Sequence, residues 1–274
     1  MNKKVNIKEN TFVVTNKMLF PSFAPHILID LDKKEVKNKL KENHCFLLRY
    51  VTNFDKEEKN NFWYIIKDTF VPIEDFSKNT RNQVKKGIKN CEVKKVNLNY
   101  IQDNCYDIYK SAMEAYNMPF ITESEFKKYS HEDQIRDYWV VISKEKNIPI
   151  AYSSNIIQED TCNYAYIKFH PNYQDYYPSY ALHYEMDKYY LEDNKVKYVN
   201  VGAKSIYHQT KVQEFLIQKF KYRRAYCNLN IIYTKKIGIA VSILYPFRKI
   251  ISKIPFAKFN KINAILRQEE STRS

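Results

Sequence analysis

Short apolar runs alternate along the chain with longer stretches in which apolar residues recur every three or four positions. The short runs are rich in β-branched and aromatic residues, which is typical of strands. They cover residues 26–31, 45–51, 62–67, 91–98, 138–143, 149–157, 162–169, 197–201 and 226–233. The longer spacing predicts helices over residues 77–90, 101–116, 179–191 and 208–220. Together the patterns predict a mixed α/β (α+β) fold with helices flanking a central sheet.

The order of the predicted elements in the C-terminal half places one turn in a special position. Three strands follow one another over residues 138–169, and HPNYQDYYPSYAL (170–182) then leads into a helix. A strand that turns into a helix suits a phosphate, because free N–H groups and the helix dipole attract an anion. Turns that hold phosphate usually rely on glycine, and this one has none. It is either a phosphate loop with unusual residues or an ordinary turn in which Ser179 caps the helix.

Composition indicates a globular protein with an excess of positive charge. The chain has 274 residues, enough to bury a core without disulfides or metals, and a formal net charge of +14. Such a charge suits an anionic partner, which includes a nucleotide cofactor, a nucleic acid or a membrane surface, although a basic chain can also simply be soluble. Helix 77–90 contributes Arg81 and Lys85, which form either an anion-binding wall or a solvated face.

The cysteines point away from disulfides and metals. The five cysteines are scattered and show no zinc-ligand spacing, and Cys45, Cys162 and Cys227 lie in strand-like runs where they are expected to be buried. This pattern suits a reducing compartment. The polar start of the chain has no signal-peptide pattern, and the apolar run 237–245 is too short to span a bilayer. We therefore expect a cytoplasmic protein without a metal.

The C-terminal segment, residues 235–274, mixes apolar and basic positions. It holds nine Lys/Arg and two Glu. Its apolar candidates are Phe247, Ile250, Ile251 and Ile254, and its basic neighbours are Arg248, Lys249 and Lys253. A basic amphipathic segment of this kind either lies on an anionic membrane or docks on its own domain. The first alternative predicts peripheral contact with the inner membrane face through residues 237–259.

Two sequence motifs resemble those of known acyltransferases. Phe169 to Leu182 resembles the GNAT pattern V-x-P-x-[YF]-[RQ]-x-x-G-x-G-x-x-L, with Pro171, Tyr173, Gln174 and Leu182 in register and Tyr177 and Ser179 at the glycine positions. The segments TRNQVKKGIKNCEV (80–93) and 198–226 resemble FemAB-like proteins, a branch built from GNAT lobes. The resemblance covers roughly residues 72–233. It implies an N-terminal lobe (1–134), a C-terminal core lobe (135–234) and a basic tail (235–274).

The resemblance implies an acyltransferase with a cleft between two lobes and direct attack by an acceptor amine or hydroxyl. The expected donor is acetyl-CoA or another acyl-CoA, and the expected acceptor is a small metabolite, a sugar or a cell-envelope precursor. One alternative is an aminoacyl-tRNA donor in peptidoglycan or lipid modification. Another is a non-enzymatic module at the membrane surface. The donor-binding candidates are Gln174, Tyr177, Ser179, Tyr180 and Ala181.

The loop GAKSIYHQT (202–210) is the best candidate for catalytic groups. Acyl transfer needs a base for the nucleophile and an acid for the leaving group. His208 has a pKa range suited to the base, Tyr207 or Tyr222 suits the acid, and Lys204 lies in the same loop. The alternative is that these are ordinary loop residues beside a helix cap. Arg81 and Lys85 are the candidates for substrate binding.

Overall fold

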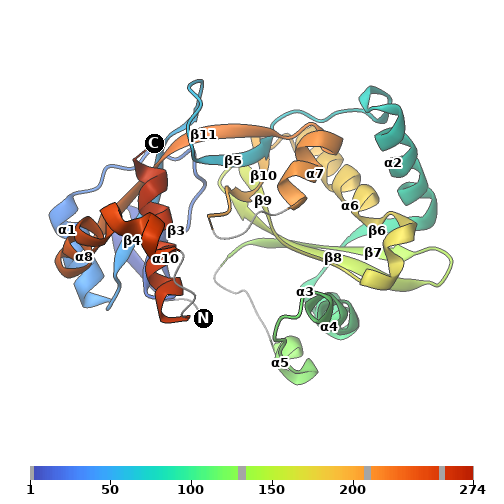
Figure 1. Ribbon diagram of the computed structural model, residues 1–274. Helices are drawn as coiled ribbons and strands as arrows, with labels where there is room; N and C mark the ends of the chain where they lie inside the picture. Colours follow the sequence, from blue (N-terminus) through green and yellow to red (C-terminus); the bar gives the residue numbers. More distant parts are fainter. Residues whose placement is uncertain (1–2, 129–133, 207–210, 253–256, 274) are drawn as a thin grey trace. The chain divides into compact units, whose positions relative to one another are not determined.

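The protein is described by a computed structural model that covers residues 3–128, 134–206, 211–252 and 257–273. The described chain divides into two compact units (Figure 1). The first unit is drawn from Met1–Tyr64, Ala203–Thr210 and Arg224–Ser274, and the second from Ile65–Gly202 and Lys211–Arg223. The predicted boundary at residue 134 therefore falls inside the second unit, and the predicted tail belongs to the first. The chain crosses between the units within β5 (Trp63–Lys67), at the last residue of β10 (Tyr198–Ala203), between Thr210 and Lys211, and within β11 (Arg223–Tyr233).

The first unit contains a sheet that starts with a meander. Its strand order is β1-β2-β3-β4-β11, with β3 and β4 parallel and the other neighbours antiparallel. The first four strands are β1 (Lys4–Ile7), β2 (Asn10–Thr15), β3 (Met18–Pro21) and β4 (Leu47–Lys56). Alternation buries Val5 and Ile7 under helix α1 (Lys33–Glu42), which begins at Asp32, whose carboxylate accepts the N–H groups of Lys34 and Glu35.

Helices close the C-terminal part of the first unit. They are α8 (Lys235–Leu244), the 3₁₀ turn η4 (Tyr245–Phe247), α9 (Arg248–Ile251) and α10 (Ala257–Thr272). Helix α10 packs on α8 and α9. Among the described residues, no helix combines the length and the apolar character that crossing a bilayer requires.

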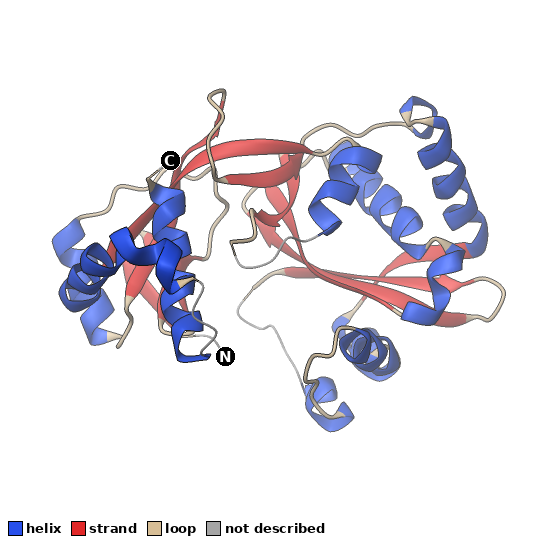
Figure 2. Ribbon diagram, viewed as in Figure 1, coloured by secondary structure: helices blue, strands red, loops and turns tan. Residues whose placement is uncertain are grey.

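The second unit has a mixed sheet with helices on both faces (Figure 2). Its strand order is β5-β10-β9-β8-β7-β6, and β9 and β10 form a parallel pair while β6 to β9 are antiparallel. The remaining strands are β6 (Cys91–Val96), β7 (Arg136–Ser143), β8 (Ile148–Gln158) and β9 (Thr161–Phe169). One face carries α2 (Lys78–Asn90), α6 (Pro178–Asp187) and α7 (Lys211–Phe220), and the other carries α3 (Leu98–Asn104), α4 (Tyr106–Ala115) and α5 (Glu123–Lys128).

Most of the predicted elements are present, and three predictions need correction. Residues 26–31 form no strand, because Leu28 is 88% exposed and the segment has no strand partner in the described chain. The single helix predicted over 101–116 is two helices that meet at Cys105. The first three strands were not predicted, although residues 11–14 (TFVV) and 18–20 (MLF) are short apolar runs. The expected burial of Cys45, Cys162 and Cys227 is confirmed, and all three are free thiols.

A buried polar cluster lies between the sheet and α6 in the second unit. Lys67 Nζ is 2.8 Å from Asp187 Oδ2, and both side chains are almost fully buried. The hydroxyls of Tyr164 and Tyr222 donate to Asp187 Oδ1 at 3.0 and 2.7 Å. One carboxylate thus accepts from an ammonium and two phenols, which compensates for its removal from water.

Candidate functional site

The stretch 170–182 forms a tight turn at the end of β9. Residues Pro171–Tyr176 make a 3₁₀ turn, Tyr177 adopts the left-handed conformation (φ 58°, ψ 42°), and Pro178 begins α6. A tyrosine in this conformation is uncommon, because its Cβ approaches the backbone. Proline at the first helical position has a suitable φ and needs no N–H partner. The N-cap residue of α6 is therefore Tyr177, and Ser179 does not cap the helix.

The backbone donors of this turn are fewer than the sequence suggested. The amides of Tyr180 and Ala181 both donate to the carbonyl of Tyr177, at 3.1 and 3.3 Å, and the amide of Tyr177 donates to Gln174. Tyr180 and Ala181 are also buried. The prediction that Tyr180 and Ala181 offer N–H groups to a phosphate is therefore corrected. The amide of Ser179, on a half-buried residue, is the member of the predicted cradle that stays a candidate.

Helix α2 packs directly on the start of α6. A Cβ on Gly87 would lie 2.7 Å from the carbonyl oxygen of Tyr177, so only glycine allows this approach. Lys86 of the same helix lies 5.5 Å from the ring centre of Tyr177. Arg81 donates to the carbonyl of Glu74 at 3.1 Å, and Lys85 is exposed. The substrate-binding roles predicted for Arg81 and Lys85 stay predictions, while Lys86 is the cation that α2 brings to the turn.

The predicted catalytic residues lie in different surroundings. Tyr222 is 3% exposed and donates to Asp187, and burial raises its pKa well above the ordinary value. A phenol enclosed in this way cannot deliver a proton to a ligand, so the acid role predicted for Tyr222 is corrected to a structural one. Lys204 donates to the carbonyl of Asn61 at 2.8 Å and lies 4.4 Å from the ring centre of Trp63, and burial lowers its pKa. Tyr207 and His208 lie outside the described residues.

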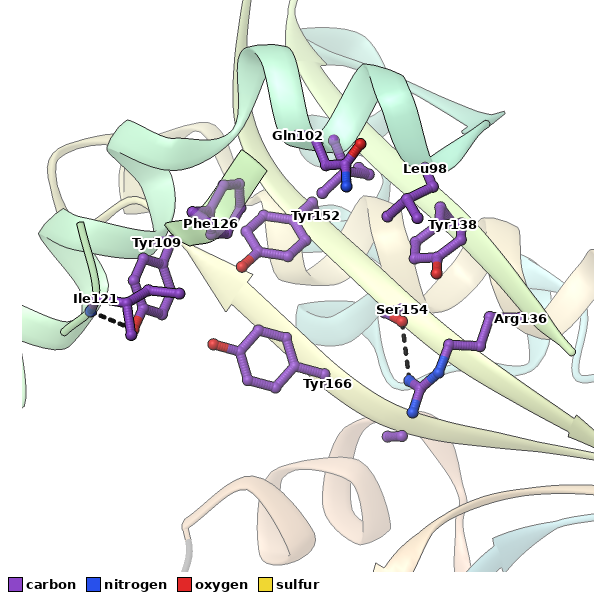
Figure 3. Close-up of a pocket in the computed structure, with 12 residues that line it drawn as sticks. Leu98, Gln102, Tyr109, Ile121, Phe126, Arg136, Tyr138, Tyr152, Ser154 and Tyr166 are labelled. Carbon is purple, nitrogen blue, oxygen red and sulfur yellow. Dashed lines mark hydrogen bonds between the residues drawn. The ribbon is translucent and has the colours of Figure 1, made fainter. Parts of the chain in front are cut away.

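A cavity of about 390 Å³ lies on the α3–α5 face of the sheet in the second unit (Figure 3). Its volume is in the range of small-molecule sites. The polar side chains on its wall are Gln102, Arg136 and Ser154. The aromatic and aliphatic side chains are Tyr109, Phe126, Tyr138, Tyr152, Tyr166, Leu98, Ile101, Ile121 and Ala165. The wall therefore suits a ligand with an apolar or ring-shaped part and a small number of polar groups.

A β-bulge in β9 shapes the floor of this cavity. Asn155 of β8 faces two residues of β9, Tyr164 and Ala165, because the register shifts between Ser154 and Ile156. Side chains normally alternate between the faces of a strand. Here Tyr164 reaches Asp187 on the α6 face, whereas Ala165 and Tyr166 both line the cavity. Bulges of this kind are frequent beside active sites, where they re-aim a side chain.

The same point of β9 is where its pairing with β10 ends. The parallel register runs from Thr161–Tyr198 to Asn163–Asn200, and the bulge follows immediately. Within the described chain, residues 164–169 of β9 pair with β8 only. The backbone N–H and C=O groups on that edge can therefore pair with an extended ligand, as the edge of a sheet does with an added strand.

Asn200 places a buried donor at the end of the parallel register. The side chain is 1% exposed, and its Oδ1 accepts the N–H of Gly202 at 3.1 Å. Its Nδ2 has no hydrogen-bond partner among the described residues. A buried amide nitrogen without a partner is costly, so a site for a ligand oxygen or a water is the natural explanation.

The polar groups of the cavity are held in place by neighbouring side chains. Arg136 donates to Ser154 Oγ at 3.0 Å and to Gln134 Oε1 at 2.7 Å. Burial, and then the neighbouring Tyr166, raise the pKa of Tyr152, so its phenol stays neutral. The hydroxyl of Tyr109 accepts the N–H of Ile121 at 3.2 Å, which fixes the cavity wall near α5 (Figure 3).

Sequence reasoning did not find the cavity or Asn200. Tyr138, Tyr152 and Tyr166 come from three consecutive strands, and each resembles an ordinary aromatic strand residue in a chain that has 24 tyrosines. The signal that was present is the run of three antiparallel strands, whose registers bring these residues to one face. The described residues contain no group of three or more His, Cys, Asp or Glu side chains that could hold a metal ion.

The chain has a GNAT-like fold of the FemAB-like form, as predicted. FemX shares the fold over 88% of this chain and 90% of its own, with a TM-score of 0.59 and 8% identity. Two further structures are similar. The C-terminal domain of a putative lysylphosphatidylglycerol synthetase from Agrobacterium fabrum has a TM-score of 0.51 and 10% identity, and covers 89% of this chain and 88% of its own. A conserved protein of unknown function from Bacteroides thetaiotaomicron has a TM-score of 0.55 and 11% identity, with 85% and 86% covered.

Neither a protein-family model nor a curated protein sequence matches this chain. At 8–11% identity the structural likeness defines the fold and leaves the chemistry to be argued from the site.

Proposed function

We propose that this protein is an acyltransferase that moves an acyl group from acyl-CoA to an amine or hydroxyl acceptor. The observation that carries the proposal is the parting of β9 from β10 directly beside the bulge and the cavity. This arrangement offers a strand edge beyond the register with β10, a buried amide donor and a roomy aromatic pocket within one unit. An acyltransferase needs such features, because it must hold the donor and the acceptor next to each other.

The donor is proposed to run along the edge of β9 beyond its register with β10. Its phosphates lie at the turn, near the amide of Ser179 and the side chain of Lys86. From there the amide groups of the pantetheine arm pair with residues 169 to 164, a path of six residues or roughly 20 Å. The thioester then reaches the bulge next to Asn200. Of the donor-binding candidates predicted from the sequence, Ser179 keeps its role at the phosphates, and Gln174 and Tyr177 lie in the same turn. Tyr180 and Ala181 are buried packing residues.

Asn200 is proposed to stabilise the reacting carbonyl. The acceptor nitrogen or oxygen attacks the acyl carbon, the carbonyl oxygen gains negative charge, and the C–S bond then breaks to release the CoA thiolate. A fixed N–H donor aimed at that oxygen stabilises the charged state more than the ground state. The proton lost by the acceptor goes to a base. His208, which the sequence predicted for this role, lies outside the described residues. The thiolate takes a proton from an acid, for which Tyr166 replaces Tyr222 because its phenol lines the cavity.

The cavity is proposed to bind the acceptor. Its aromatic side chains favour an apolar or sugar ring, and Gln102, Arg136 and Ser154 offer polar contacts. Small metabolites, sugars and cell-envelope precursors all fit this description. An aminoacyl-tRNA donor is the second candidate, since a net charge of +14 suits the phosphates of a nucleic acid.

Donor binding can be tested by thermal unfolding with CoA, acetyl-CoA or tRNA. At a donor concentration about 100 times the Kd, we expect CoA and acetyl-CoA to raise the Tm by about 5 °C or more. Ser179→Trp covers the proposed phosphate site and should remove this shift. Asn38→Trp, on the exposed side of α1, is the matched control and should keep it. A shift with tRNA alone would favour the second donor. The absence of a shift with any of the three would favour the non-enzymatic module.

A further inference from the structure

Helix α8 and the turns that follow it present an unusual outward face in the first unit. Ile239, Ile243, Phe247 and Ile250 are 53%, 62%, 54% and 66% exposed. They are spaced by four, four and three residues, so they form one line along α8, η4 and α9, which we call the apolar stripe. The exposed positions between them include Ala240 and Pro246, which add no charge.

The opposite side of the same segment already supplies the contacts with the domain. Val241 and Ile251 are 6% and 7% exposed, and α10 packs against α8 and α9. A surface helix normally has one apolar side facing the core and a polar side facing water. In this segment both sides are apolar. The stripe is therefore a second apolar surface, separate from the side that packs on the domain. Contiguous exposed apolar residues of this kind mark an interaction surface.

The charges within the segment that carries the stripe all have one sign. Residues 235–252 contain Lys235, Lys236, Arg248 and Lys249 and no Asp or Glu. The nearby carboxylates of α10 are already paired, because Glu270 contacts Arg248 at 3.0 Å and Glu269 contacts Arg273 at 2.9 Å. Lys235, Lys236 and Lys249 are exposed beside the stripe.

We propose that the apolar stripe docks onto the surface of an anionic phospholipid bilayer. Ile and Phe side chains enter the boundary between head groups and acyl chains, and the lysines contact the lipid phosphates. Residues 235–252 carry positive charges only, which favours an anionic bilayer over a protein surface, because a protein surface usually presents both signs of charge. The line of apolar residues differs from the predicted one: Phe247 and Ile250 belong to it, Ile251 is buried, and Ile254 lies outside the described residues. This proposal does not depend on the acyl transfer.

The test is co-sedimentation of the full chain with vesicles of phosphatidylcholine, with and without phosphatidylglycerol. We expect binding to the vesicles that contain phosphatidylglycerol, and weaker binding as salt is raised. The double variant Ile243→Ser/Phe247→Ser should bind more weakly than the wild type by about tenfold or more. Leu28→Ser/Val212→Ser removes two apolar side chains elsewhere that are 88% and 56% exposed, and it should bind like the wild type. All these substitutions are at exposed positions, and unchanged Tm values would show that the variants are folded.

The proposal is overturned if the wild type stays in the supernatant with anionic vesicles, or if the Ile243→Ser/Phe247→Ser variant binds as well as the wild type. Analytical ultracentrifugation covers a further outcome. A dimer that the double variant loses, together with no vesicle binding by the wild type, would assign the stripe to contact between copies of the chain and would contradict the lipid proposal.

Discussion

Replacing Asp187 with alanine is expected to lower the free energy of unfolding of the second unit by about 3–5 kcal/mol, because it leaves the ammonium of Lys67 buried without a counter-charge. Lys67 and Asp187 are 3% and 1% exposed at the side chain, and water cannot replace the lost carboxylate. The hydroxyls of Tyr164 and Tyr222 lose their acceptor at the same time. Unfolding in urea, followed by the fluorescence of the buried Trp139, measures the effect.

Two further variants make this measurement specific. Glu123→Ala breaks the exposed pair between Glu123 and Lys127 in the same unit and should cost less than about 1 kcal/mol. Lys67→Met/Asp187→Leu removes both charges together and should be less destabilised than Asp187→Ala, because no charge remains buried. If Asp187→Ala unfolds at the same urea concentration as Glu123→Ala, the buried cluster does not have the role assigned to it.

The second large effect is a loss of stability in mild acid through His183. Burial is the main cause that lowers the pKa of His183 to about 4. The charge of Asp187 raises this pKa by a smaller amount, and the charge of Lys67 lowers it. In the unfolded chain the same imidazole takes up a proton near pH 6.5. The unfolded state therefore binds more protons between these two pH values. Stability is full above pH 6.5 and falls by about 3 kcal/mol as the pH drops toward 4.

The contribution of His183 can be isolated by difference. His183 lies against Tyr164, Phe215 and Phe220, and its Nδ1 has no hydrogen-bond partner among the described residues, so phenylalanine is a suitable replacement. The difference in unfolding free energy between wild type and His183→Phe should change by about 3 kcal/mol from pH 7 to pH 4. Asn38→Gln, at an exposed position without a titratable group, should leave the pH profile unchanged. A constant difference across this pH range would contradict the buried, neutral state of His183.

Local patterns were enough to predict much of the fold. Ser77 caps α2 by accepting the N–H of Thr80, and the alternation in residues 138–169 corresponds to β7, β8 and β9. The family motifs located the turn at 170–182 and the segment that runs from β10 to α7. These features depend on neighbours in the sequence, and a single chain carries that information.

The functional geometry depends on contacts between distant residues, and sequence patterns do not contain it. The bulge at Tyr164–Ala165 follows from the register between β8 and β9, and the unpartnered amide of Asn200 follows from the end of the register with β10. Tyr222 illustrates the reverse error. A tyrosine after a helix resembled an acid for catalysis, but Asp187, 35 residues away in sequence, holds it in the core.

The central claim is that the cavity beside the β9 bulge is where the acyl group is transferred. The most direct measurement is the release of free CoA thiol from acetyl-CoA in the presence of a panel of amines and hydroxyl compounds that carry an apolar or sugar ring. We expect acceptor-dependent release by the wild type. In Ala165→Trp, whose side chain fills the cavity, we expect this release to be lost and the CoA-induced Tm shift to be retained. Ala115→Trp, at an exposed position of α4, should behave like the wild type. Release by Ala165→Trp at the rate of the wild type would contradict the account.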